Sequence, residues 1–127
     1  MNRASHWRER SAPLQLLVGE RSVSLAIEVA RTPGARLRGW LGLRSAPRER
    51  GLWLVPCDAV HTIGMQFALD LVFVDAAGRV LRIDHHVAPW RLRVCIGAFS
   101  VVEMDAGTAE EIGLAVGDEL ALQPENS

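Results

Sequence analysis

The sequence predicts a mainly β fold: a compact β-sandwich or barrel of about eight or nine short strands, with one short α-helix near residues 33–42. The chain has 127 residues, 49% hydrophobic and 23% charged, which is the ordinary balance of one globular domain. Short apolar segments, several with a period of two, recur along it between Gly, Pro and Asp turn signals. Because these segments do not alternate with helices, a parallel Rossmann-type sheet is not expected.

The first two expected strands are 14–18 and 23–29, joined by a hairpin-type connection. Apolar residues take every second position of the second segment, which is typical of a strand with one buried face. Residues 1–13 are polar and rich in Arg, so we expect a loosely held arm there. The domain itself is expected over 14–122, and residues 123–127 are expected to fray.

The expected helix begins at Thr32 and Pro33, because Thr is a favourable N-cap and Pro suits the first helical position. Three apolar residues follow at i, i+3 and i+4 and form a stripe that can pack on the sheet. Arg36 and Arg38 lie off this stripe.

Further strands are expected over 51–55, 69–74, 79–87, 92–96, 99–104 and 119–122. The segment 75–78 has the composition of a turn, with Gly78 placed for a positive φ. Thr108 and Glu111 have the spacing of a capping box, which predicts one helical turn.

The charges divide unevenly along the chain. All 14 basic residues are Arg, and the formal net charge is −1. Residues 1–50 contain ten Arg and four acids, whereas residues 51–127 contain four Arg and eleven acids. Because the Arg residues are dispersed and form no basic run, we expect the two halves to neutralise each other within one fold. Nucleic acid is therefore not the expected partner.

Several classes of protein are excluded by what the sequence lacks. No apolar stretch reaches the ~20 residues of a membrane-spanning helix, so no membrane insertion is expected. The charged N-terminus is not followed by the apolar segment of a signal peptide, and we expect a cytoplasmic protein. No phosphate-binding, dinucleotide-binding or zinc-binding motif is present, so no cofactor is expected. Whether the protein is an enzyme stays open.

The densest group of chemically capable residues ends at Asp70. His61 can act as acid, base or ligand, as imidazole side chains in general do, and Thr62 adds a hydroxyl. Asp70 stands among apolar residues, where a carboxylate needs polar partners, and Arg36 or Arg38 could be that partner. Two interpretations stay open: Asp70 anchors the helix to the sheet, or it forms the polar floor of a ligand pocket.

Trp90 and Glu103 complete the candidate set. Trp90 stands beside two Arg residues, a combination that can stack on a base and hold a phosphate. A solvated edge strand with a half-buried Trp is the alternative interpretation. Glu103 stands in a buried-strand context, where it either pairs with an Arg of the first half or lines the same pocket as Asp70.

Metal binding is not expected. Adjacent strand residues point to opposite faces, so His85 and His86 cannot share one ion unless a bulge intervenes. A three-ligand site that joins one of them to His61 and to Asp84 or Glu103 is the alternative. Cys57 and Cys95 lack CxxC spacing and are expected as buried thiols, with a disulfide or a catalytic thiolate as alternatives.

Taken together, these residues resemble the bacterial and archaeal DUF192 family over about residues 14–122. The most specific part is the segment 69–75, Leu-Asp-Leu-Val-Phe-Val-Asp. The resemblance implies a compact β-sandwich or barrel with one helix and no established activity, and its recurrent polar positions fall on Asp70, Asp75 and Glu103. Residues 61–65 have the form His-Thr-x-Gly-Met, where many members carry an aromatic-Met pair and Lys-Asn-Thr. The chain therefore resembles a His-Thr-x-Gly-Met branch.

Three functions follow as hypotheses. The first is a non-enzymatic domain that binds a polar small ligand or a protein partner in a pocket near His61 and Asp70. The second is a hydrolase-like enzyme in which His61 is the general base and Asp70 orients it, with Thr62, Cys57 or water as nucleophile. The third is nucleic-acid binding through the Arg-rich first half and Trp90. The candidate ligand-binding residues are Arg36, Arg38, His61, Thr62, Asp70, Trp90 and Glu103.

Overall fold

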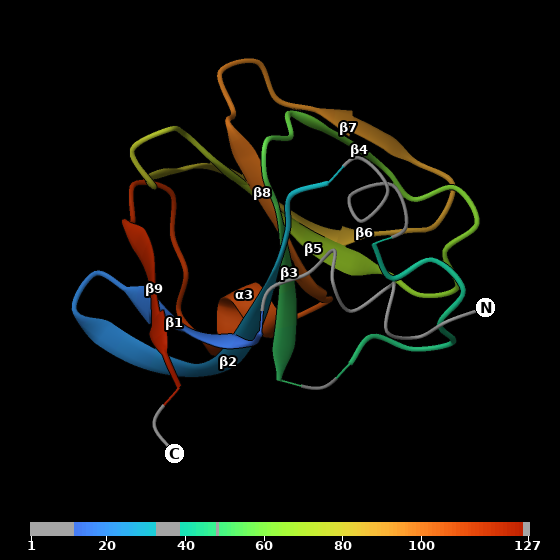
Figure 1. The fold of residues 1–127 in the computed structure, drawn as a ribbon. Helices are drawn as coiled ribbons and strands as arrows, with labels where there is room; N and C mark the ends of the chain where they lie inside the picture. Colours follow the sequence, from blue (N-terminus) through green and yellow to red (C-terminus); the bar gives the residue numbers. More distant parts are fainter. Residues whose placement is uncertain (1–11, 33–38, 48, 126–127) are drawn as a thin grey trace.

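The computed structural model describes residues 12–32, 39–47 and 49–125. Within them the chain forms nine strands and one short helix (Figure 1). The strands are β1 (Leu14–Val18), β2 (Arg21–Ala30), β3 (Arg50–Leu54), β4 (Ala59–His61), β5 (Leu69–Val74), β6 (Val80–Val87), β7 (Leu92–Val94), β8 (Ser100–Asp105) and β9 (Leu120–Pro124). The helix α3 (Thr108–Glu111) stands between β8 and β9. The predicted mainly β class is confirmed.

Seven strands form one curled sheet. Its order is β6-β5-β8-β3-β2-β1-β9, and only β2 and β3 run parallel. The curl brings the two outer strands together at one end, where Arg79 before β6 forms an isolated bridge with Glu119 before β9. Since β6 and β9 are not paired along their lengths, the sheet is an open curl and not a closed barrel (Figure 1).

The curled sheet separates two apolar clusters. The inner cluster takes residues from all seven of its strands and from α3, so it fills the inside of the curl. It comprises Leu16, Val18, Val23, Leu25, Ile27, Val29, Trp53, Val72, Val74, Val80, Val102, Met104, Ala109, Leu114 and Leu120. The outer cluster comprises Ala30, Trp40, Ala46, Leu52, Leu54, Val60, Leu69, Leu71, Phe73, Val87, Cys95 and Val101. All six residues of β5 are buried because a cluster lies on each of its faces.

The second sheet contains only β4 and β7, which pair antiparallel. Val60 of β4 and Cys95 after β7 belong to the outer cluster, so this small sheet covers the outer face of the large one. Figure 1 shows β4 and β7 on the opposite side of the molecule from β9 and β1.

The predicted helical turn at 108–111 is present as α3, but the predicted capping box is wrong. The N-cap is Gly107, with φ 96°, and no cap side chain bonds the helix. The helix predicted near 33–42 lies largely outside the described residues, and its described end, 39–42, forms turns.

Two differences in the strands have local causes. β4 was not predicted, because three residues are too few for a period-two pattern to be recognised. β9 continues two residues into the segment expected to fray, because Gln123 and Pro124 pair with Gln15 and Leu14 of β1.

Candidate functional site

Asp70 lies on β5 and is fully buried. Its side chain accepts three hydrogen bonds, all from backbone amides. Oδ1 accepts from the amide of His86 at 2.9 Å, and Oδ2 accepts from the amides of Gly107 and Ala109 at 3.0 Å each. The carboxylate therefore joins β5 to β6, to the turn after β8 and to the first turn of α3. The anchoring interpretation concerned the helix expected near residues 33–42, whereas these contacts anchor α3.

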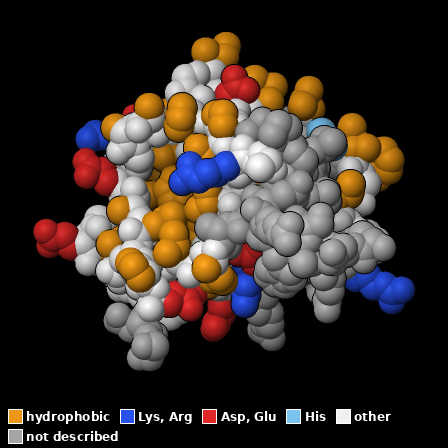
Figure 2. Space-filling view, in the orientation of Figure 1, with side chains coloured by type: hydrophobic (Ala, Val, Ile, Leu, Met, Phe, Trp, Pro, Cys, Tyr) orange, Lys and Arg blue, Asp and Glu red, His pale blue; other side chains and the backbone are white. Residues whose placement is uncertain are grey.

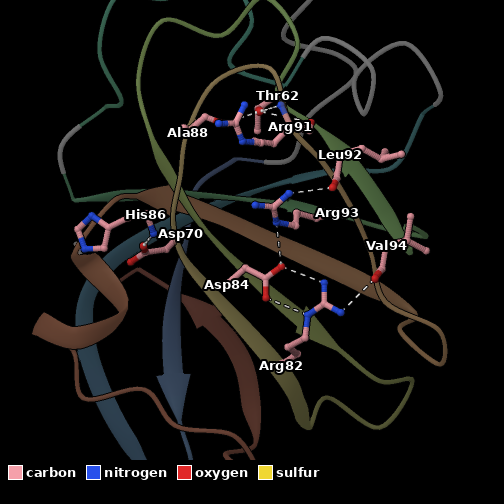
Figure 3. A network of polar contacts seen from close by, with 10 residues as sticks. All are labelled: Thr62, Asp70, Arg82, Asp84, His86, Ala88, Arg91, Leu92, Arg93 and Val94. Carbon is pink, nitrogen blue, oxygen red and sulfur yellow. Dashed lines mark hydrogen bonds and ion pairs between the residues drawn. The ribbon is translucent and has the colours of Figure 1, made fainter.

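A bulge in β6 explains why a carboxylate is needed there. The register shifts between Leu69 and Leu71, so that His85 and His86 of β6 both lie opposite Asp70. His86 has φ 51°, in the left-handed region. The amide of a bulged residue leaves the regular ladder, and the Asp70 side chain supplies the acceptor that it needs (Figure 3).

Arg36 and Arg38 lie outside the described residues. The hydrogen bonds of Asp70 among the described residues all come from backbone amides, and a pairing of Asp70 with either Arg stays a prediction. A pairing of either Arg with Glu103 stays a prediction.

Asp70 and Glu103 lie on opposite faces of the large sheet. In the register of β5 and β8, Asp70 pairs with Met104 and Leu71 pairs with Glu103. Cross-strand partners share a face, so Asp70 lies on the side of the inner cluster and Glu103 on the side of the outer cluster. The expectation that the two carboxylates line one pocket is therefore wrong.

Thr62, directly after β4, is fully buried and bonded within the protein. Its Oγ1 donates to the carbonyl of Ala88 at 2.7 Å and accepts from the amide of Arg91 at 2.8 Å. Its amide donates to the Arg91 carbonyl, and its carbonyl accepts from the amides of Trp90 and Met65. Thr62 thus holds the connection between β6 and β7 in place (Figure 3).

The side chains of β7 alternate between the protein and solvent. Arg93 points inward, whereas Leu92, Val94 and Ile96 are 63%, 49% and 96% exposed. Trp90 precedes them with φ 66° and is 66% exposed, so it is not half-buried as the edge-strand interpretation expected.

β4 contributes to the same exposed surface. His61 pairs with Leu92, and both are exposed, so they share the outward side. Ile63 is exposed in the turn that follows. We call the exposed side chains of His61, Ile63, Trp90, Leu92, Val94 and Ile96 the β4–β7 face. Figure 2 shows apolar side chains projecting from this part of the molecule.

The structure does not bring His61 and Asp70 together. His61 is exposed on the β4–β7 face, whereas Asp70 is buried on the inner side of β5 with its oxygens bonded to amides.

A charged network holds the small sheet against β6. Asp84 accepts from Arg82 through both carboxylate oxygens at 2.9 Å, and Nε of Arg93 lies 3.6 Å from Oδ2 (Figure 3). Arg82 also donates to the Val94 carbonyl at 3.1 Å, and its guanidinium lies 4.6 Å from the centre of the Phe73 ring. Sequence reasoning missed this network. The Arg-x-Asp spacing on one strand was the available signal, but the contact with β7 depends on tertiary structure.

Two backbone carbonyls at the edge of β7 that faces away from β4 accept hydrogen bonds from Arg side chains. The carbonyl of Arg91 and the amide of Cys95, on either side of β7, bond Thr62 and Asp58 next to β4, so the carbonyls of Leu92 and Val94 face away from β4. The Leu92 carbonyl accepts from Arg93 at 3.0 Å, and the Val94 carbonyl accepts from Arg82. These guanidiniums hinder the addition of another strand at this edge.

The described part of the chain contains neither a group of metal ligands nor a disulfide. No group of three or more His, Cys, Asp or Glu side chains there could hold a metal ion. Cys57 and Cys95 form no disulfide; Cys95 is buried, and Cys57 is half-buried. None of the helices in the described ranges has both the length and the apolar character needed to cross a membrane.

The model of the DUF192 family, described as an uncharacterized ACR, matches residues 15–122. The chain belongs to the DUF192 family. Two solved structures resemble it: a "putative transcription regulator" from Sinorhizobium meliloti 1021 and a protein of unknown function from Novosphingobium aromaticivorans DSM 12444. The first has 22% identity and a TM-score of 0.77, covering 87% of this chain and 94% of its own. The second has 21% identity and a TM-score of 0.75, covering 87% and 84%. The likeness shows a shared fold. No curated protein matches the chain.

Three surface hollows of this DUF192 protein lie away from the predicted site residues that the structure describes. One lies between β2 and Glu125, one lies beside α3, and one lies between β3 and β9. None of the three is lined by His61, Thr62, Asp70, Trp90 or Glu103. His61 lies instead among the exposed apolar side chains of the β4–β7 face.

Proposed function

We propose that this DUF192 protein is a non-catalytic binding module that docks a protein partner on the β4–β7 face. The observation that carries the proposal is the row of apolar side chains at every second position from Trp90 to Ile96, all of them exposed. Isolated exposed apolar residues are normal on a protein surface, but a contiguous group is typical of an interaction site.

Hydrogen bonds and ion pairs on the inner side of the β4–β7 face hold its backbone in place. Thr62 fixes the connection that carries Trp90, and Asp84 ties both Arg82 and Arg93 beneath the strand. A surface whose backbone is ordered before binding loses less conformational entropy on docking, which favours affinity.

The chemistry of the face suggests what the partner presents. Exposed Trp side chains are frequent anchors of protein interfaces, and Trp90 lies beside exposed Arg91. The carbonyls of Leu92 and Val94 at the edge of β7 already accept hydrogen bonds from guanidiniums. Docking through side chains is therefore favoured over the addition of a strand. We therefore infer a partner with an apolar patch flanked by acidic groups.

The test compares two matched surface substitutions. Leu92 is 63% exposed on the β4–β7 face, and Val116 is 64% exposed outside it. Leu92→Glu is expected to remove a partner that wild type and Val116→Glu both capture from the source cells, and to weaken its purified complex at least about tenfold. Both variants should unfold like wild type, because surface substitutions change stability by only about 0.5 kcal/mol. Identical capture and affinity for the two variants would refute the proposal.

Nucleic-acid binding is the second candidate, because Trp90 and Arg91 are both exposed and one structural neighbour is named a "putative transcription regulator". It predicts oligonucleotide binding that weakens steeply with salt and is lost in Trp90→Ala. The acid–base alternative has less support, since no contact between described residues couples His61 to Asp70.

The placement in a His-Thr-x-Gly-Met branch is also a proposal, and two of its residues have structural roles that support it. Thr62 makes the buried bonds described above, and Gly64 has φ 82°, where other residues would be strained.

A further inference from the structure

The hollow between β3 and β9, which we call the seam hollow, lies at one end of the curled sheet, beside the place where β6 and β9 meet. Gly78 and Leu120 both line it, and the amide of Leu120 donates to the carbonyl of Gly78 at 2.7 Å, next to the Arg79–Glu119 bridge. The turn at 75–78 and the start of β8 complete the walls. Figure 2 shows apolar side chains gathered in this region beside a basic one. Its volume is about 280 Å³.

The walls of the seam hollow are mostly apolar. Its apolar lining comprises Val29, Trp53, Val55, Ala76, Ala77, Phe99, Leu120 and Leu122. A pocket with an apolar lining and a few polar groups is the usual form of a small-molecule site. The volume lies near the lower end of the ~300–1,000 Å³ range of such sites, so the occupant would be about the size of one ring or a short chain.

Three polar side chains line the seam hollow. Ser100 is 3% exposed, and its Oγ accepts a bond of 2.7 Å from the indole of Trp53. The hydroxyl proton of Ser100 has no acceptor among the described residues, and a buried donor without an acceptor is unusual. Arg31 contributes an exposed guanidinium. Oδ1 of Asp75 accepts hydrogen bonds from the amides of Ala77 and Arg79, at 2.9 Å each.

We propose that the seam hollow binds a small carboxylic acid with a flat or short apolar body. The body packs on the apolar walls, and the carboxylate accepts from the Ser100 hydroxyl and the Arg31 guanidinium. The negative charge of Asp75 repels the carboxylate of the ligand, which keeps that carboxylate on the Arg31 side of the hollow. The site is independent of the β4–β7 face, so either proposal can fail without the other.

The test uses benzoate and benzamide, which have the same shape but differ in charge, titrated into the full-length ¹⁵N-labelled protein. The reporter is the indole N–H resonance of Trp53, whose donor bonds Ser100 at the wall. Benzoate is expected to shift this resonance saturably and to bind about tenfold more tightly than benzamide, as a charge-assisted bond in place of a neutral one implies.

Three variants test the assignment. Arg31→Gln should weaken benzoate about tenfold and leave benzamide unchanged, whereas Arg21→Gln, which alters an Arg at a different hollow, should change neither. Ala76→Trp should fill the hollow from an exposed turn position and abolish both shifts while the protein stays folded. The proposal is overturned if benzoate leaves the Trp53 resonance unmoved at millimolar concentration, or if Arg31→Gln and Arg21→Gln bind it equally.

Discussion

Replacement of Asp70 by Asn tests the central anchor of the fold. Asn has nearly the same shape as Asp, but only one of its two terminal atoms is an acceptor. With its oxygen at the Oδ2 position, the Asn side chain could still accept from Gly107 and Ala109, and its amino group would then meet the amide of His86, donor against donor. With the opposite orientation, two bonds would be lost instead of one.

The expected cost follows from these three bonds. A hydrogen bond to a charged group contributes about 1.5–3 kcal/mol, and a neutral one about half as much. The loss of one such bond and the weakening of two others should lower the free energy of unfolding by about 3–6 kcal/mol. This is a large fraction of the stability of about 5–15 kcal/mol that is typical of a domain. The penalty is not relieved by water, because Asp70 is fully buried.

Urea unfolding followed by circular dichroism measures this loss as a lower midpoint with an unchanged slope. Asp118→Asn is the control, since among the described residues the Asp118 side chain accepts one amide bond, from Ala115 at 2.8 Å, near the surface. It should cost about 1 kcal/mol or less. Amide exchange at His86, Gly107 and Ala109 should accelerate in the Asp70 variant alone. A loss below about 1 kcal/mol for Asp70→Asn would refute the anchoring role.

Two further substitutions test other contacts that define the fold. Thr62→Val keeps the shape but removes the bonds to Ala88 and Arg91, so it should cost about 1–3 kcal/mol in thermal or urea unfolding. An unchanged exchange rate of the Arg91 amide would contradict it. Gly78→Ala should cost about 1–3 kcal/mol, because Gly78 has φ 90° and a new Cβ would lie 2.9 Å from the carbonyl oxygen of Leu120. Wild-type stability of this variant would show that the turn and β9 can separate freely.

The sequence predicted the strands whose side chains alternate or form an apolar run. β1 and β5 have the predicted bounds, because local patterning and flanking turn residues suffice to define such strands. The family and the mainly β class followed from the same local signals together with the segment 69–75. β4 was missed because its existence depends on pairing with β7, which lies some thirty residues along the chain.

The candidate site was less accessible from sequence. The sequence marked Asp70 as a carboxylate that needs partners, but its donors come from residues 16 to 39 positions away. The side on which His61, Asp70 and Glu103 point depends on register, and a shift of one residue reverses the face.

The sequence by itself therefore determined the fold class, most of the strands and the chemistry available at each position. Tertiary structure decided which groups meet: three amides on Asp70, an exposed apolar row beside His61, and a hollow beside the place where the two ends of the sheet meet. The physical reason is that periodicity and turn preference are local, whereas strand pairing and sheet curl set contacts between residues far apart in the chain.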